Sequence, residues 1–359
     1  MKILIDIGHP AHVHLYRNFY NEMTERGHSL YVTVKNLPSA TRLLYLYGIP
    51  YTLIGSKGDT LASKGVRQVF FSLRLAAMAS RLGIDVGVGS SISLAHASVP
   101  SRMKSVIFDD DDDRVQPLMT RYGHPFADMI VSPSSLKNAR ASGKALFYPG
   151  YHELAYLHPC RFTPDPEVLN DAGVSQGETF FIMRFNAFRA HHDKGVEGLT
   201  TGQKLELVKL LESRGRVFIT TEAEAEPELA KYKLGVSPEK AHSLLSYATM
   251  FIGDSQTMTS EAAILGTPAL KCNSFAHKLS VPNMLEEKYD LCYAFQPDEF
   301  DSMMAKIVSL LDNDELKHFW AGKRERFLKD SINPTDFLVR FIESYPLCKG
   351  GLSLRQKTD

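Results

Sequence analysis

Two successive series of short apolar segments alternate with helical patterns, and this alternation limits the fold more than any other feature of the chain. The segment Lys2–Ile7 is apolar enough for a strand buried on both faces, a helical pattern follows at 13–26, and another apolar run follows at 30–34. Strand–helix alternation of this kind builds a parallel sheet covered by helices on both faces. Further strands of the first series are expected at 51–54, 86–88, 105–108 and 129–131.

The pattern is interrupted at 148–153 and 162–166, where prolines and a glycine indicate a crossing between domains. A second alternating series then begins, with strands expected at 180–183, 217–220, 248–252 and 269–270. We therefore predict an α/β protein with two Rossmann-like, doubly wound parallel-sheet domains that face a central cleft. The boundaries are placed at 1–160 and 161–332, and 333–359 is assigned to a C-terminal helix and tail. Whether that helix returns to the N-terminal domain is left open.

A helix with a polar start is expected in the segment GDSQTMTSEAAILGTP at 253–268. Asp254 or Ser255 can cap this helix through a side-chain oxygen. The amides left uncapped and the positive end of the helix dipole together form a seat for phosphate. Glu261 lies about two turns into the helix, where its carboxylate can accept hydrogen bonds from ribose hydroxyls. The segment is thus predicted to bind a nucleotide.

Other polar motifs also follow predicted strands, at the sheet edge where ligands bind in such folds. Among His9, His12 and His14, we favour His12 as a general base, because histidine titrates near neutral pH. The alternative is that these histidines belong to a loop and cap a helix. In the run 109–113, Asp109 or Asp110 is assigned to base work or to binding a substrate hydroxyl rather than to holding a metal. The alternative there is a solvated acidic loop.

A basic loop follows the first strand of the second domain. It contains Arg184, Arg189, His191, His192 and Lys194. We expect it to neutralise a departing diphosphate, since electrostatic stabilisation acts where charge develops. Arg184 and His191 are the first choices, and His192 stays open. A solvated turn is the alternative.

The segment 65–82 mixes apolar residues with arginines at helical spacing. An ordinary helix packed on its sheet explains the pattern, and a packed amphipathic helix looks the same in sequence. The alternative is peripheral contact with an anionic membrane, which a lipid-linked substrate would require.

Composition excludes several classes of protein. Lysine plus arginine and aspartate plus glutamate number 41 each, so no global charge favours nucleic acid. The four cysteines form no CxxC pair, which argues against a zinc site or a disulfide framework. The first residues lack the apolar core of a signal peptide. We therefore expect a cytoplasmic location, with peripheral attachment to the inner membrane face as the alternative.

The segment DSQTMTSEAAILGTP resembles the D-S-G-G-x-x-E-E-x-x-x-L-G-x-P segment of UDP-N-acetylglucosamine 2-epimerases. It is also similar to the S-E-x-x-x-x-G-x-P segment of the peptidoglycan N-acetylglucosaminyltransferase. Both belong to the GT-B superfamily, and the resemblance implies that Glu261 binds ribose. The loop GHPAHVHL at 8–15 resembles the G-G-H loop of many GT-B transferases, whose histidine aligns with His12. The resemblance implies a donor site. Its residues would be Asp254, Ser255, Gln256, Thr257 and Glu261, with Arg184 and His191 beside the diphosphate.

The chain departs from the epimerases at three places. The aspartate of their G-D-T turn has no counterpart at 87–91, and 116–121 lacks their P-E-E glutamates. Gln256 and Thr257 replace the two glycines of D-S-G-G. The leading hypothesis is therefore a metal-independent transferase that moves a sugar from a nucleotide-sugar, preferably a UDP-sugar, to a carbohydrate or lipid-linked acceptor. The nucleotide-sugar is a substrate, and no cofactor is expected. An epimerase or hydrolase and a non-catalytic nucleotide-sugar-binding protein are the alternatives.

Overall fold

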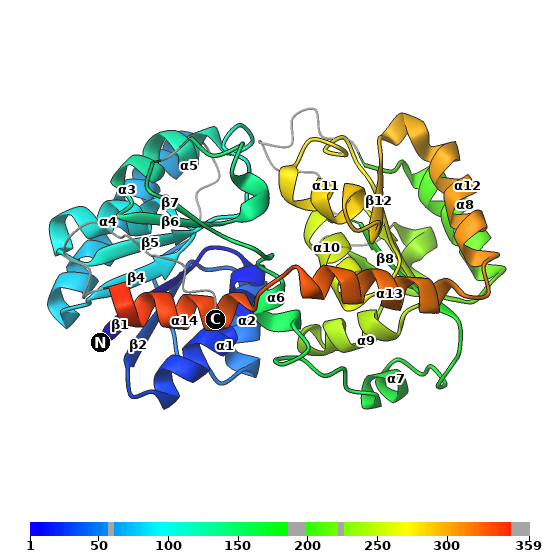
Figure 1. Cartoon of the computed structure of the whole chain (residues 1–359), viewed down its shortest axis with the longest axis horizontal. Helices are drawn as coiled ribbons and strands as arrows, with labels where there is room; N and C mark the ends of the chain where they lie inside the picture. The colour runs from blue at the N-terminus through cyan, green and yellow to red at the C-terminus, as the bar shows by residue number, and fades with distance from the viewer. Residues whose placement is uncertain (57–60, 142, 186–197, 222–225, 346–359) are drawn as a thin grey trace.

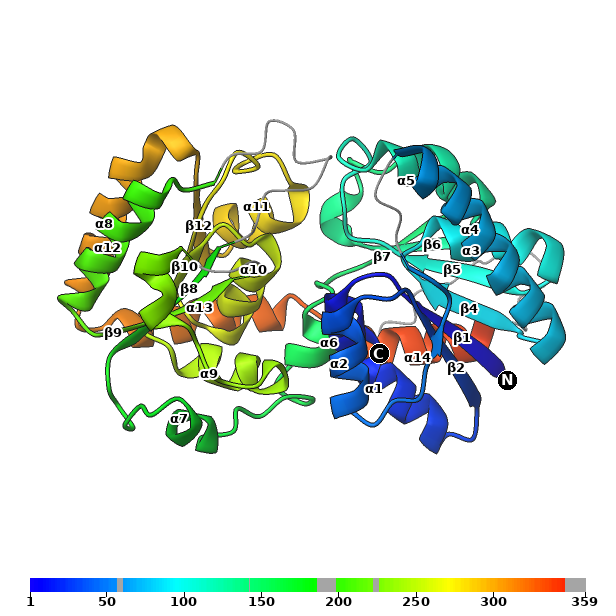
Figure 2. The ribbon, with the colours of Figure 1, turned by 180° about the vertical axis from the view of Figure 1, so that it is seen from behind.

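The computed structural model describes residues 1–56, 61–141, 143–185, 198–221 and 226–345. Two α/β domains lie beside each other, each built on one parallel sheet (Figure 1; Figure 2 from behind). This confirms the predicted fold class.

The first domain contains a seven-stranded sheet in the order β3-β2-β1-β4-β5-β6-β7. Its strands are β1 (Lys2–Ile7), β2 (Ser29–Val34), β3 (Thr52–Leu53), β4 (Val86–Gly89), β5 (Lys104–Phe108), β6 (Met129–Pro133) and β7 (Ala145–Tyr148). Its helices are α1 (Pro10–Glu25), α2 (Pro38–Leu46), α3 (Leu61–Leu82), α4 (Ile92–Ser101), α5 (Pro117–Tyr122) and α6 (Leu154–Leu157), with 3-10 turns η1 (His124–Phe126) and η2 (Ser134–Leu136).

The second domain contains a five-stranded sheet in the order β12-β11-β10-β8-β9. Its strands are β8 (Phe180–Phe185), β9 (Arg216–Thr221), β10 (Met250–Gly253), β11 (Ala269–Cys272) and β12 (Cys292–Phe295). Its helices are α7 (Glu167–Asp171), α8 (Thr201–Glu212), α9 (Ala241–Tyr247), α10 (Gln256–Leu265), α11 (Ser280–Glu287), α12 (Phe300–Leu311) and α13 (Leu316–Lys329). Its 3-10 turns are η3 (Pro227–Tyr232), η4 (Pro238–Lys240) and η5 (Pro297–Glu299).

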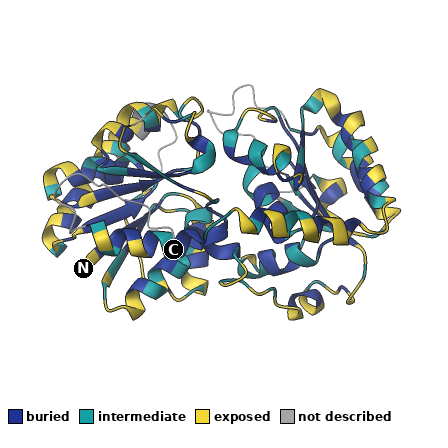
Figure 3. Cartoon of the chain, viewed as in Figure 1, coloured by how far each residue is buried: buried dark blue, intermediate teal, exposed yellow. Residues whose placement is uncertain are grey.

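The central strands of both sheets are buried between helices, which explains their nearly continuous apolar sequence (Figure 3). At the end of β10 the backbone comes so close to β8 that only glycine fits. A Cβ added to Gly253 would lie 2.3 Å from the carbonyl oxygen of Arg184. The strand therefore ends close-packed, and the chain turns directly into α10.

Within the described residues, the chain crosses between the domains twice and returns to the first one. The last described helix, α14 (Pro334–Ser344), packs against α1 and α6. The Thr335 hydroxyl donates to the carbonyl oxygen of Ala155 at 2.9 Å, and Arg161 forms ion pairs with Glu22 and Asp336. The C-terminal helix thus returns to the N-terminal domain. Across the ranges that the structure describes, no helix combines the length and hydrophobicity that a membrane span requires.

Candidate functional site

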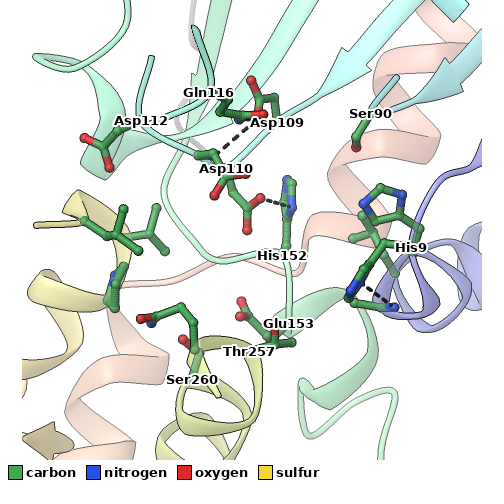
Figure 4. Close-up of a pocket in the computed structure, with 18 of the residues that line it drawn as sticks. His9, Ser90, Asp109, Asp110, Asp112, Gln116, His152, Glu153, Thr257 and Ser260 are labelled. Carbon is green, nitrogen blue, oxygen red and sulfur yellow. Dashed lines mark hydrogen bonds and ion pairs between the residues drawn. The ribbon is translucent and has the colours of Figure 1, made fainter. Parts of the chain in front are cut away.

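A cavity of about 390 Å³ lies between the two domains, where the carboxyl ends of their strands face each other (Figure 4). The first domain contributes His9, His12, Ser90, Asp109–Asp112, Gln116, His152, Glu153 and Tyr156, among others. The second contributes Gln256, Thr257 and Ser260 from α10 and Leu279, Val281 and Pro282 from α11 and the residue before it. Such a position is typical of ligand sites in α/β sheets.

Asp110 and His152 form a carboxylate–imidazole pair in this cavity. Asp110 follows β5, and His152 belongs to the segment that leaves β7 for the second domain. Asp110 Oδ1 lies 3.2 Å from His152 Nδ1, and the imidazole is stacked on the Phe108 ring. Burial would raise the pKa of Asp110, but the facing His152, together with His12 and a backbone hydrogen bond, lowers the pKa overall.

The contact fixes the tautomer of the neutral ring. With its Nδ1 proton directed at Asp110, His152 carries an unprotonated Nε2. Nε2 is buried and has no hydrogen-bond partner among the described residues. This is the arrangement of a general base that a carboxylate orients.

Glu153 lies next to this pair and points into the same cavity (Figure 4). Burial, followed by the negative charge of Asp110, raises the pKa of Glu153 to about 8. Its Oε2 is buried, and no described residue forms a hydrogen bond with that atom. Glu153 is therefore a carboxylic acid that holds its proton at neutral pH, beside a carboxylate that does not. Pairs of this kind divide acid and base roles.

Asp109 also lines the cavity, but its carboxylate is occupied by hydrogen bonds within the first domain. It accepts them from Gln116 Nε2 at 2.7 Å and from His124 Nε2 and Arg140 Nη1 at 2.9 Å each. Burial would raise the pKa of Asp109, yet the His124 hydrogen bond and the Arg140 charge lower it. These contacts fit a residue that holds the acidic loop in place. Both predicted aspartates contact an imidazole, but only the partner of Asp110, His152, is among the described residues that line the cavity.

The carboxylates of the acidic loop are spaced closely enough to bind a metal ion, but the groups around them do not suit one. One carboxylate oxygen from each of Asp109, Asp110 and Asp111 lies within 4.8 Å of the others. The buried Arg140 guanidinium already contacts Asp109 Oδ2, and His152 contacts Asp110. A divalent ion bound by Asp109 would lie against the Arg140 guanidinium, so the residues do not fit a tightly held metal.

His12 contributes to the wall of the cavity in a form unlike the predicted base. Its Nδ1 accepts the backbone N–H of Gly8 at 3.3 Å, which leaves the ring proton on Nε2. Burial, followed by the nearby His9, lowers the pKa of His12 to about 3. The ring therefore offers the cavity a hydrogen-bond donor. His9 caps α1 by accepting from the N–H of Ala11, and His14 packs against His242.

The predicted capping of α10 is present. Ser255 is the N-cap and accepts from the N–H of Met258 at 3.5 Å, and Asp254 is buried beside it. Gln256 and Thr257 face the cavity. The Nζ of Lys271 on β11 donates to Gln256 Oε1, which turns the amide Nε2 the other way. Burial lowers the pKa of Lys271 to about 8.

Glu261 is buried behind the cavity and does not line it within the described chain. Its Oε1 accepts from the Tyr156 hydroxyl at 2.8 Å and lies 3.0 Å from His242 Nε2. It thus joins α10 to α6 and α9. Its role toward ribose stays a prediction, and a ligand there would have to share or replace these contacts.

Of the two residues predicted to hold the diphosphate, Arg184 is not among the described residues that line the cavity. Arg184 is half-buried near the end of β8, and its carbonyl oxygen accepts from the N–H of Asp254 at 3.1 Å. His191 falls in 186–197, outside the described residues. Their roles therefore also stay predictions.

A direct contact closes one side of the cavity. The buried Asp112 carboxylate accepts from the N–H of Ser280 at 2.8 Å and from its hydroxyl at 2.6 Å. Ser280 is the first residue of α11, so a carboxylate of the first domain lies at the positive end of a helix of the second. The acidic run thereby contributes to domain closure as well as to the cavity.

Comparisons with known proteins agree with this architecture. The model of the family described as "Protein of unknown function (DUF354)" matches residues 1–322. An uncharacterised protein of Methanocaldococcus jannaschii is 21% identical over 292 residues, which cover 76% of this chain and 82% of that protein. UDP-GlcNAc 2-epimerase from Neisseria meningitidis, solved with UDP-GlcNAc, has a TM-score of 0.66 at 13% identity and covers 96% of this chain and 100% of its own.

A glycosyltransferase shows the same likeness. The spinosyn forosaminyltransferase SpnP has a TM-score of 0.62 at 16% identity, covering 96% of this chain and 98% of its own. At such identities the likeness establishes the fold, which is that of GT-B enzymes, and the reaction has to be argued from the site.

Proposed function

Because the chain belongs to the DUF354 family, whose description assigns no activity, we propose a function from the site itself: transfer of a sugar from a nucleotide-sugar to a hydroxyl acceptor, in the synthesis of a surface polysaccharide or glycoconjugate. The observation that carries the proposal is the oriented Asp110–His152 pair, which shares one interdomain cavity with the start of α10.

Each half of the cavity has a distinct task. The acceptor hydroxyl gives its proton to His152 Nε2 as its oxygen bonds to the anomeric carbon, and Asp110 stabilises the imidazolium that forms. The bond from the anomeric carbon to the diphosphate breaks at the same centre. The charge that develops on the diphosphate meets the amides at the start of α10 and the amide of Gln256. No metal takes part.

A uridine nucleotide is the favoured donor component. The support is the resemblance of 254–268 to the epimerase segment and the UDP-GlcNAc in the similar Neisseria structure. Thermal melting against UDP, GDP, CMP and dTDP compounds and their sugars tests this. At ~100 times its dissociation constant a ligand adds roughly 2.7 kcal/mol to the folded state. A shift with one nucleotide class is expected, and the absence of any shift would count against the donor site.

Variants then separate binding from chemistry. His152→Gln and Asp110→Asn should retain the thermal shift and lose about 10²–10⁴ in the rate of transfer, as expected when a general base is lost. His318→Gln, at an exposed histidine on α13, is the matched control and should leave both unchanged. Unchanged transfer in His152→Gln would reject the assigned base.

The proton held by Glu153 favours a second candidate, an epimerase or hydrolase that turns over the donor alone. Such an enzyme needs two acid–base groups near the sugar ring, and Glu153 and His152 together supply them. Incubation of the donor without acceptor in deuterated water distinguishes the candidates. Deuterium on the sugar ring or acceptor-independent release of nucleotide would favour the second, and an intact donor would favour transfer. Binding without turnover under either condition would indicate a non-catalytic binding protein.

A further inference from the structure

Helix α3 is apolar on two faces, although only one of them is packed. Phe71, Leu75 and Ala79 are buried in the core beneath it. Val66, Val69, Phe70 and Leu73 follow the i, i+3, i+4, i+7 spacing of a single stripe, and their side chains are 54–73% exposed. The expected packing on the sheet therefore accounts for half of this helix and leaves the outer stripe unexplained.

The neighbouring elements extend this apolar surface. Leu118 and Tyr122 on α5, Phe126 in η1 and Val99 on α4 are also large exposed apolar side chains. The elements are tied together, since Gln68 of α3 donates to Ser93 of α4 and the His96 ring of α4 contacts Phe126. Figures 1 and 2 both show α3, α4 and α5 as one layer, whose outer side is largely exposed in Figure 3. We call this surface the α3–α5 face.

The charged residues of the three helices in this face all have positive side chains. The sequences of α3, α4 and α5 contain no aspartate or glutamate, although acidic and basic residues balance over the whole chain. Arg67, Arg74 and Arg81 recur every seven residues and so form a row along one edge of the apolar stripe, and Arg121 adds a positive charge on α5. Apolar side chains bordered by arginines suit an interface between hydrocarbon and anionic headgroups.

We propose that the α3–α5 face docks on an anionic lipid bilayer. The apolar stripe would enter the headgroup region, while Arg74, Arg81 and Arg121 remain at its surface and contact lipid phosphates. A second copy of the chain fits less well, because a two-fold pair through this face would bring two arginine rows together with no acid to offset them. The docking does not depend on the reaction. It would bring the cavity near the membrane, because Gln116, the N-cap of α5, is one of the residues that line the cavity. That suits a lipid-linked acceptor.

Flotation of the full chain with vesicles tests the proposal. Vesicles of equal parts phosphatidylcholine and phosphatidylglycerol should carry the protein, whereas vesicles of phosphatidylcholine alone should not, and added salt should weaken the binding. Arg74→Gln combined with Arg81→Gln should lower partitioning roughly 25-fold, since each arginine near an anionic surface contributes about fivefold. The same exchange at the exposed Arg42 and Arg340 is the charge-matched control.

Two variants test the contribution of the apolar side chains to membrane binding. Phe70→Ser should weaken flotation, and Phe319→Ser on α13 should not, although the two side chains are similarly exposed at 54% and 52%. Both changes lie at the surface, so melting temperatures should stay within a few degrees of the parent. Failure to float with anionic vesicles, or equal loss in the control variants, would overturn the proposal. A dimer that Phe70→Ser dissociates, without vesicle binding, would instead identify a second copy as the occupant.

Discussion

Glu153→Gln should stabilise the protein at neutral pH. The substitution keeps the size of the side chain and removes its titration. Burial raises the pKa of Glu153 from 4.5 to about 8, so the folded chain binds this proton more tightly than the unfolded chain does. Stability from this group is therefore complete below pH 4.5 and is lost as the pH rises toward 8.

The magnitude follows from the two pKa values. At pH 7 the wild-type protein loses about 3 kcal/mol relative to acid pH, because folding must return a proton to a carboxyl that is ionised in the unfolded chain. Glu153→Gln avoids this cost. Its gain at pH 7 is thus about 3 kcal/mol, which for 359 residues corresponds to roughly 4 °C in melting temperature.

Melting curves of both proteins between pH 4 and pH 8.5 provide the measurement. The difference should be near zero at pH 4 and largest above pH 8. Glu287→Gln, at an exposed glutamate on α11, should shift little at any pH. A difference that does not vary with pH, or a loss of stability at pH 7, would show that Glu153 is ionised in the folded protein.

Three further results are expected. The pKa of His12, lowered by burial to about 3, means that the unfolded chain takes up its proton first as pH falls below 6.5. The free energy of unfolding should therefore fall by about 2 kcal/mol by pH 5. In urea melts, His12→Asn should lose less stability than the wild type over this pH range, and parallel profiles of stability against pH for the two proteins would contradict this. Asp112→Ala removes the acceptor of two hydrogen bonds between domains and should enlarge the radius of gyration in X-ray scattering; an identical curve would argue against a role in closure. Glu261→Gln should cost roughly 1–3 kcal/mol through Tyr156 and His242. If its nucleotide-induced thermal shift stays intact, the predicted ribose contact is wrong.

The buried strands were predictable because burial on both faces leaves a continuous apolar run. The runs that form β1, β5, β6, β8 and β10 are of this kind. Two strands at sheet edges, β7 and β12, were not predicted. Each has four residues and is only partly buried, so its sequence carries a weak signal. Their positions depend on pairing with β6 and β11.

The site was predictable on the α10 side and less so opposite. Ser255 caps the helix as local sequence indicates, but neighbouring aspartates in 109–113 differ only through partners distant in the chain. Asp109 meets Arg140, whereas Asp110 meets His152. His152 and Glu153 lie in YPGYHE, whose proline and glycine indicate a crossing between domains. A predicted strand at 145–148 would have marked them as residues beyond a strand end.

The path of the chain also sets the order in which the molecule can be completed. Because α14 covers α1 and α6 after the second domain has been made, the first domain lacks one of its packed helices until nearly all of the chain has left the ribosome. The second domain is continuous in sequence and does not need a helix that is synthesised later. During synthesis, in which domains generally fold as units, the later domain can therefore finish before the earlier one. Truncation before Pro334 should therefore leave α1 and α6 uncovered, although both helices lie far from the cut in sequence.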